Sequence, residues 1–156
     1  MAYIRYKEIT RNFTFSKYIE PEQVPSYVKD YVYDEEKMLA VYRVGKDYSV
    51  FTDKKMVIFD NSQNFGGKKE VMTIPYRSAT AHSIAFHPTY AEIYMLMETS
   101  NPLILKFSNL KDLDKYRLRV LYNAISAAIC GIDIPKKIIK CLTDNDFRFG
   151  DEKEEK

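Results

Sequence analysis

Gly66-Gly67-Lys68-Lys69 is the stretch of the sequence that invites comparison with a phosphate-binding loop. A P-loop has the pattern G-x-x-x-x-G-K-[ST] between a strand and a helix, so that backbone N–H groups and the helix dipole hold phosphate. Here Ser62 occupies the position of the first glycine, and Lys69 occupies that of the hydroxyl residue that holds magnesium. The residues that follow, 70–74, have the pattern of a strand. We therefore predict a hairpin loop in which glycine supplies positive φ, and we expect no nucleotide cofactor.

Histidines, cysteines and carboxylates form no convergent catalytic or metal-binding set in the sequence. His82 and His87 are separated by a strand end, and no cysteine lies near them. Cys130 and Cys141 end two helices and are expected to be small buried hydrophobes. The run Asp34-Glu35-Glu36 lies in a polar turn, where solvation explains the charges better than acid–base catalysis does. We expect a protein that is not an enzyme, with no catalytic residue, no metal site and no cofactor.

The N-terminal arm, residues 1–20, interleaves aromatic and basic side chains. Such a segment can stack on nucleic-acid bases, or it can pair with an open sheet edge. We favour a sheet edge or a helix, of the same chain or of a neighbouring subunit. The reason is that Ile9 to Ile19 carries too much apolar surface to leave in water.

Basic residues also gather in the C-terminal helical region, where Arg117 and Arg119 precede three lysines. They form either a solvated helix face or a contact for an acidic protein or nucleic acid. The candidate partner-binding residues of the whole chain are Arg5, Arg11, Phe13, Phe15, Tyr18, Lys136, Lys137 and Lys140.

Composition limits the classes of protein that these residues can serve. The chain has 156 residues, of which 46% are hydrophobic and 29% charged, which suits one soluble globular domain. The net charge of +2 is too small to indicate nucleic acid or an anionic membrane by itself. The sequence shows neither an apolar signal region nor the run of about 18 apolar residues that spans a membrane. We expect a cytoplasmic protein.

Periodicity predicts the elements that must position these side chains. A short helix is expected at 21–32, where proline and acidic residues suit a first turn. A long amphipathic helix is expected at about 110–130, capped by Ser108 or Asn109 and ended by Gly131. A shorter helix follows, to about residue 142. Between the first two helices, about seven strands are expected, at 39–44, 48–52, 55–59, 68–74, 78–86, 92–98 and 103–107.

Two stretches of this strand-rich region resemble a known family, the bacterial pleckstrin-homology-like domains. Residues 50–57, VFTDKKMV, resemble the family's "fTnkRli" strand pair. The residues GGKK at 66–69 and IPYRS at 74–78 resemble its "GkK…siPyssI" stretch. The resemblance covers about residues 34–130. It implies a mainly β fold, a barrel or sandwich of about seven antiparallel strands capped by the C-terminal amphipathic helix.

The expected organisation has four parts, and three of them lie outside the residues that resemble the family. They are an N-terminal arm and short helix at 1–32, the pleckstrin-homology-like domain at 34–131, a short C-terminal helix and extension at 132–150, and a disordered charged tail at 151–156.

The resemblance implies an interaction module, because most such domains look like interaction modules. Many eukaryotic pleckstrin-homology domains bind phosphoinositides with several basic residues around the first hairpin. The matching hairpin here offers only Arg43 and Lys46, and Asp47 subtracts from their charge, so we do not expect that ligand.

We predict a non-catalytic protein-interaction or assembly module, bacterial or phage-encoded, whose partner is a protein, the chain itself included as a homo-oligomer. The alternative is an inhibitor that binds a host nucleic-acid-processing or defence protein. A weaker alternative is a nucleic-acid binder that uses the basic helices and the arm.

Overall fold

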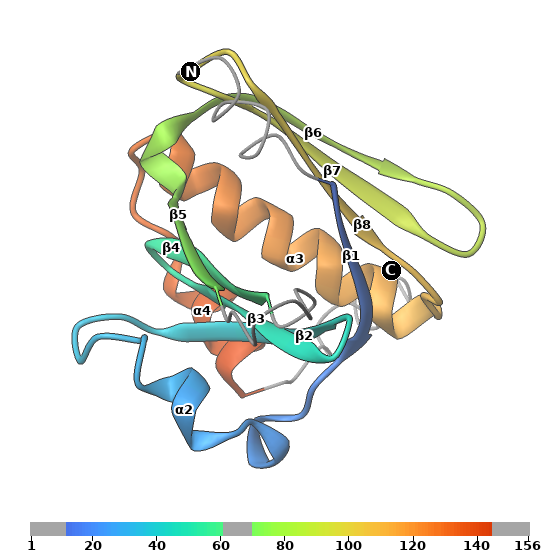
Figure 1. Ribbon diagram of the computed structural model, residues 1–156. Coiled ribbons are helices and arrows are strands. Elements are labelled where there is room, and N and C mark those ends of the chain that lie inside the picture. The colour runs from blue at the N-terminus through green and yellow to red at the C-terminus, as the bar shows by residue number, and fades with distance from the viewer. Residues whose placement is uncertain (1–11, 61–69, 145–156) are drawn as a thin grey trace.

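Eight strands form one curled sheet in the computed structural model, which describes residues 12–60 and 70–144 (Figure 1). Their order across the sheet is β5-β4-β3-β2-β1-β8-β7-β6, and every neighbouring pair is antiparallel except β1 and β8. The strands are β1 (Asn12–Tyr18), β2 (Met38–Val44), β3 (Asp47–Thr52), β4 (Lys55–Asp60), β5 (Glu70–Pro75), β6 (Ala79–Phe86), β7 (Ala91–Met97) and β8 (Pro102–Phe107).

Strand β1 joins the two halves of the sheet. Phe15 lies opposite Val44 of β2 in an antiparallel pair, and Phe13 lies opposite Leu105 of β8 in a parallel pair. The prediction that the arm packs on a sheet edge is therefore confirmed for residues 12–18, within the same chain. This strand is also why the described sheet has eight strands rather than about seven antiparallel ones, because the arm is itself a strand.

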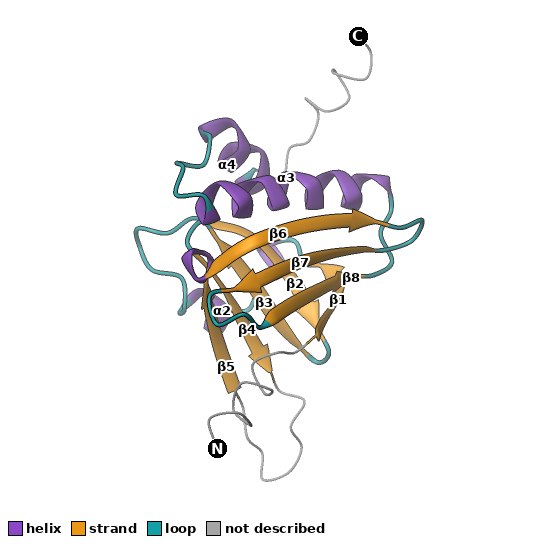
Figure 2. Ribbon diagram, turned by 90° about the horizontal axis from the view of Figure 1, so that it is seen from above, coloured by secondary structure: helices purple, strands orange, loops and turns teal. Residues whose placement is uncertain are grey.

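The main core lies on the concave side of the sheet. Phe15, Phe51 and Phe107 are fully buried there, and the rings of Phe15 and Phe107 stack with centroids 4.6 Å apart. The long helix α3 (Asp112–Ile129) lies across this side of the sheet (Figure 2). Its Leu118 and Leu121 are fully buried in the main core. The expected helical cap over a mainly β fold is thus confirmed.

A second, smaller core lies on the outer face of β2, β3 and β4. Val50 and Val57 from these strands pack with Val28, which comes from the short helix α2 (Ser26–Lys29). The prediction of one helix over 21–32 is wrong, since the segment forms two pieces, the 3-10 turn η1 (Pro21–Gln23) and α2. The break falls at Val24, which is extended with ψ 123°, because a residue before proline is disfavoured in the helical region.

The ends of α3 differ in how well the sequence predicted them. Asn109 has a left-handed φ of 56°, so the helix begins after it, at Asp112, and neither Ser108 nor Asn109 caps it. At the other end Gly131 has φ +72° and donates its N–H to the carbonyl of Ala128, as predicted for a glycine that ends a helix. Helix α4 (Lys136–Thr143) follows after a short link.

The loop with Gly66-Gly67 lies outside the described residues. The strands on either side of it, β4 and β5, pair antiparallel with Asp60 opposite Glu70. The element that follows the loop is therefore a strand and not the helix that a P-loop requires. The charged tail at 151–156 also lies outside the described residues, and the division of the chain into four parts stays a prediction.

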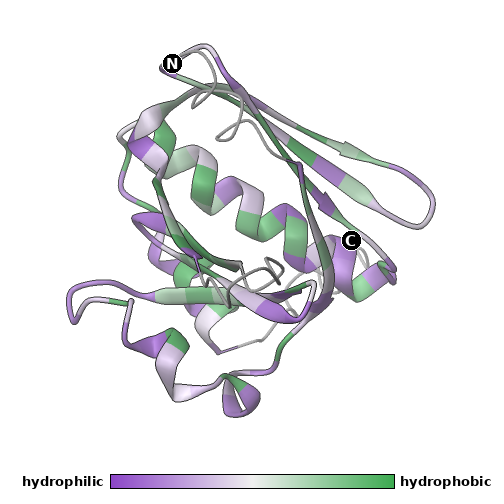
Figure 3. Ribbon diagram, in the orientation of Figure 1, coloured by the Kyte–Doolittle hydropathy of each residue, from purple (hydrophilic) through white to green (hydrophobic). Residues whose placement is uncertain are grey.

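Within residues 12–60 and 70–144, no helix is long and apolar enough to span a membrane. Figure 3 shows hydrophilic and hydrophobic residues mixed along α3 rather than one continuous apolar stretch.

Candidate functional site

A groove of about 640 Å³ opens between the turn that joins β3 to β4 and the link that joins α3 to α4. Lys54, Lys55 and Tyr76 line it from the strand side. Ala128, Ile132 and Ile139 line it from the helical side. The volume lies within the range of pockets that bind ligands, about 300–1,000 Å³.

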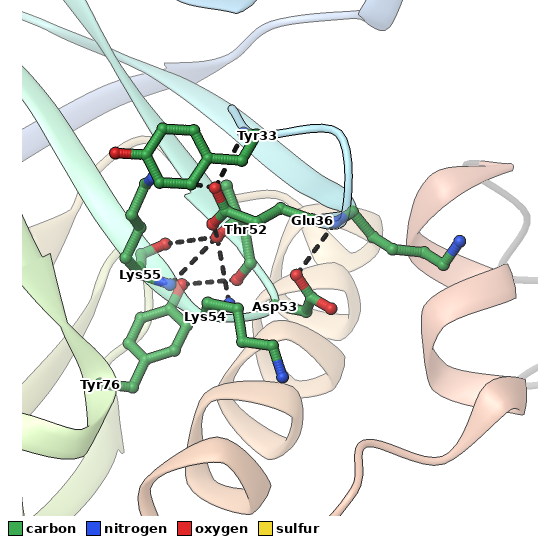
Figure 4. A network of polar contacts seen from close by, with 8 residues as sticks. Tyr33, Glu36, Thr52, Asp53, Lys54, Lys55 and Tyr76 are labelled. Carbon is green, nitrogen blue, oxygen red and sulfur yellow. Dashed lines mark hydrogen bonds and ion pairs between the residues drawn. The ribbon is translucent and has the colours of Figure 1, made fainter. Parts of the chain in front are cut away.

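A buried ion pair lies at the strand wall of this groove. The Nζ atom of Lys55 is 2.8 Å from Oε1 of Glu36, and the two side chains are 10% and 5% exposed (Figure 4). The hydroxyl of Thr52 donates to the other Glu36 oxygen at 2.7 Å, and the Tyr33 amide donates to Oε1 at 2.9 Å. Three donors from three segments therefore hold one carboxylate.

The ring of Tyr33 covers the ammonium of Lys55. The Nζ atom lies 3.4 Å from the ring centroid, in the range of a cation–π contact. The tyrosine is itself 65% exposed, so that one face of the ring meets the lysine and the rest meets solvent. Lys55 is satisfied by a carboxylate and an aromatic face together.

Further hydrogen bonds fix the turn between β3 and β4. The hydroxyl of Tyr76 donates to the Thr52 carbonyl at 2.8 Å, and the Tyr76 amide donates to the Lys54 carbonyl at 3.2 Å. The carboxylate of Asp53 accepts the Lys37 amide at 2.9 Å. Because both ends of the turn are tied down in this way, the strand wall of the groove is built as one bonded unit.

The electrostatics of this unit oppose proton transfer near neutral pH. Burial raises the pKa of Glu36, but hydrogen bonds from Lys55, Thr52 and the Tyr33 amide together outweigh burial and hold the pKa below its usual value. Burial also raises the pKa of Tyr76 well above its usual value, and the nearby charges of Asp53 and Glu36 add to the shift. Glu36 is therefore ionised and Tyr76 protonated across the neutral range.

The sequence does not reveal this network, and the interpretation of Glu36 as a solvated charge in a polar turn is wrong. Solvation does not explain Glu36, because the carboxylate is buried and bonded to Lys55, Thr52 and the Tyr33 amide. The signal that could have found the pair is the position of Lys55, which shares one face of β4 with Val57 and Phe59. A lysine on an otherwise apolar face requires a partner of opposite charge.

The predicted partner-binding residues that the structure describes have different surroundings. Phe13 and Phe15 are 5% and 1% exposed, and both rings pack in the chain's own core. Tyr18 is half-buried, with the guanidinium of Arg117 3.7 Å from its ring centroid. On α4, the side chains of Lys136, Lys137 and Lys140 are exposed. Arg5 and Arg11 lie outside the described residues. A partner-binding role for this set stays a prediction.

Two other interpretations need correction. Arg117 is not part of a solvated basic helix face, because it is 4% exposed and its Nη1 atom lies 3.0 Å from Oδ1 of Asp114. Cys130 is exposed at the end of α3 rather than buried, whereas Cys141 is buried as predicted.

The two histidines have separate surroundings. His82 lies 2.7 Å from the hydroxyl of Ser126 through Nε2, and His87 lies 3.4 Å from a carboxylate oxygen of Glu92. No group of three or more His, Cys, Asp or Glu side chains in the described ranges is arranged to hold a metal ion.

Comparison with known proteins gives matches of two kinds. By sequence, residues 8–127 match the family described as bacterial PH domain. The Uncharacterized protein YjqA of Bacillus subtilis is 37% identical over 49 residues, which cover 31% of this chain and only 39% of that relative's length.

By structure, the chain is similar to a protein with a pleckstrin-homology domain from Shewanella loihica. The TM-score is 0.57 with 20% identity, covering 72% of this chain and 96% of that one. A PH domain containing bacterial protein from Exiguobacterium sibiricum gives a TM-score of 0.54 with 17% identity, covering 76% of this chain and 63% of that one. At these identities the likeness to solved structures shows the fold alone.

Proposed function

Because the chain belongs to the bacterial PH domain family, we propose that it is a non-catalytic protein-interaction module whose groove receives a segment of a partner protein.

The observation that carries this proposal is the exposure of large side chains at the groove. Tyr33, beside Lys55 on the strand side of the groove, is 65% exposed. Ile132, on the helical side of the groove, is 63% exposed. Large apolar or aromatic side chains that flank a concave surface mark places where another molecule binds. A partner segment lying between Tyr33 and Ile132 would remove both from water.

The state of the polar groups supports binding rather than catalysis. Glu36, Lys55 and Tyr76 already have partners within the chain, so none of them is free to attack a substrate. The lowered pKa of Glu36 and the raised pKa of Tyr76 also keep their protonation states constant around neutral pH. A general acid or base works best with a pKa near the operating pH, and neither group has one.

The test is selection of binders from a random dodecapeptide library on the purified full chain. Selected peptides should lose binding to an Ile132→Glu variant, because the new charge lies in the groove. The matched control is Leu113→Glu, which changes a residue of α3 that is 56% exposed and lies away from the groove.

Far-UV circular dichroism confirms that both variants are folded before binding is compared. A library that yields no binders would refute the proposal. Binders that the Ile132→Glu and Leu113→Glu variants hold equally well would refute it too.

A further inference from the structure

Two cations of the groove, Lys54 and Arg77, have no side-chain partner among residues 12–60 and 70–144. Lys54 lies in the turn between β3 and β4, and Arg77 lies in the 3-10 turn η3 (Tyr76–Ser78). In the described part of the chain, neither side chain makes a hydrogen bond or an ion pair. Lys55 contrasts with them, because Glu36 neutralises it at 2.8 Å.

The backbone places the residues that carry these two cations close together in the lining of the groove. The amide of Tyr76 donates to the carbonyl of Lys54 at 3.2 Å, so Lys54 and Arg77 start from adjoining points on the strand wall. In Figure 4 the Lys54 side chain extends away from Glu36, with its ammonium outside the bonded network. Two adjacent unpaired cations at a concave surface attract a carboxylate, to which arginine can donate two parallel hydrogen bonds.

The acidic residues of the groove limit how much negative charge an occupant can carry. Asp53 is held by the Lys37 amide at 2.9 Å, while Glu35 and Asp133 enter the lining from two other connections. Three carboxylates therefore stand against the two unpaired cations. A polyanion such as nucleic acid would meet repulsion along most of this lining, whereas a single acidic side chain placed at the cations would not.

The helical wall supplies the other half of the recognition surface. Ala128, Ile132 and Ile139 line it, and none of them is fully buried by the chain itself. Such a wall fits a large apolar side chain, which would displace water from all three.

Resting on the function proposed above, we propose that the groove recognises an extended segment of a partner protein in which one acidic side chain stands close to a large apolar one. The acidic side chain pairs with Lys54 and Arg77, and the apolar side chain packs on the helical wall.

The composition of the selected dodecapeptides tests this assignment. The pool bound by the unmodified chain should be enriched in Asp or Glu within a few positions of Leu, Ile, Met or Phe. A synthetic peptide from the pool should bind at least about tenfold more weakly when its acid is replaced by the amide, since a charge-assisted hydrogen bond is lost.

Charge reversal sharpens the test. A Lys54→Glu, Arg77→Glu double variant should lose the acidic peptides and should select Lys- or Arg-containing peptides from the same library. The matched control is Lys29→Glu with Lys46→Glu, which reverses two exposed lysines outside the groove and should leave the acidic consensus intact.

The outcomes separate this inference from the proposed function. Peptides that lack an acid but still lose binding to Ile132→Glu would overturn the inference and leave the groove as the binding site. Acidic peptides that bind the double variant as well as the unmodified chain would also overturn it. A library without any binders would overturn the proposed function, and the inference with it.

Discussion

Glu36 links three segments of the chain through one carboxylate. Its donors are the side chains of Lys55 and Thr52 and the amide of Tyr33. The connection between α2 and β2 is thereby fastened to the turn between β3 and β4. Glu36 therefore acts together with the hydrogen bonds of Tyr76 and Asp53 in fixing the strand wall of the groove.

Replacing Glu36 by Gln should destabilise the protein by about 2–4 kcal/mol at neutral pH, because Lys55 would remain buried without an opposite charge. Urea unfolding followed by circular dichroism measures the loss. The matched control is Glu35→Gln, one residue away and exposed, which should change stability by less than about 0.5 kcal/mol. Equal effects of the two substitutions would contradict a role for the buried ion pair.

The same carboxylate gives stability a defined pH dependence. The pKa of Glu36 in the folded chain is held below its usual value of 4.5, so the unfolded state takes up the proton first as the pH falls. The contribution of Glu36 is complete above pH 4.5 and is lost as the pH falls through the lower folded pKa. The stability difference between the unmodified chain and Glu36→Gln should therefore shrink on acidification below pH 4.5. A difference that stays constant from pH 7 to pH 3 would contradict this.

The individual contacts of the network could not be predicted from the sequence. Glu36 and Lys55 are 19 residues apart, and the hydroxyl of Tyr76 reaches a carbonyl 24 residues away. Such contacts depend on strand register, which a polar turn does not specify. The residue types indicate a buried ion pair only where a charged side chain interrupts an apolar face, as Lys55 does on β4.

At the scale of elements, β1 is the strand on which the two halves of the sheet depend. Phe15 stacks on Phe107 and lies within 5.6 Å of the Phe51 ring, measured between centroids, so it packs with strands from both halves. Phe15→Ala should cost about 3–5 kcal/mol, the range for large-to-small changes in a core. Thermal or urea unfolding measures it. Thr14→Ala on the exposed face of the same strand is the control and should be nearly neutral, and a similar loss in both would contradict core packing by Phe15.

The link between α3 and α4 depends on a glycine with left-handed backbone. Gly131 has φ +72°, and a Cβ atom added there would meet nothing within 4 Å, so the cost of a side chain is conformational rather than steric. Gly131→Ala should destabilise the protein by about 1–2 kcal/mol, and Gly131→Asn by less, because Asn enters this region more readily. Urea midpoints of the two variants test the order. A larger loss for Asn than for Ala would contradict it.

Elements with strong periodicity were predicted well, and those set by backbone geometry were not. The strands from β2 to β8 follow alternation and turn residues, and α3 follows a wide apolar stripe ended by Gly131. The prediction of one helix at 21–32 failed because Pro25 disfavours a helical backbone at the residue before it, in spite of the apolar helical pattern. The predicted start of α3 was wrong because Asn109 adopts a positive φ, which the pattern of side chains does not reveal.

At the scale of the whole molecule, the described chain should unfold as one cooperative unit. The main core draws residues from both halves of the sheet, from α3 and from α4, so neither half keeps this main core when the other opens. Far-UV and near-UV circular dichroism should give coincident urea transitions. Two separated transitions would show that the halves are independent.

The overall fold was accessible from the sequence because strand alternation, the long helix and the family resemblance agreed. The groove was not, because its strand wall comes from residues near 54 and 76 and its helical wall from residues near 132 and 139. The curl of the sheet and the packing of α3 and α4 against it bring these segments together. Composition alone indicates neither that curl nor the two unpaired cations.

The parallel pairing of β1 with β8 has a consequence for synthesis on the ribosome. The carbonyl of Phe15 accepts a hydrogen bond from Ser108, a residue 93 positions later in the chain. At roughly 5–20 residues per second, β1 leaves the ribosome about 5–20 s before β8 exists to pair with it. During that interval β1 has no neighbour on one side, and Phe13 and Phe15 lack most of their core. The sheet is therefore completed only late in translation, and the nascent chain exposes its most aromatic strand for the whole of that time.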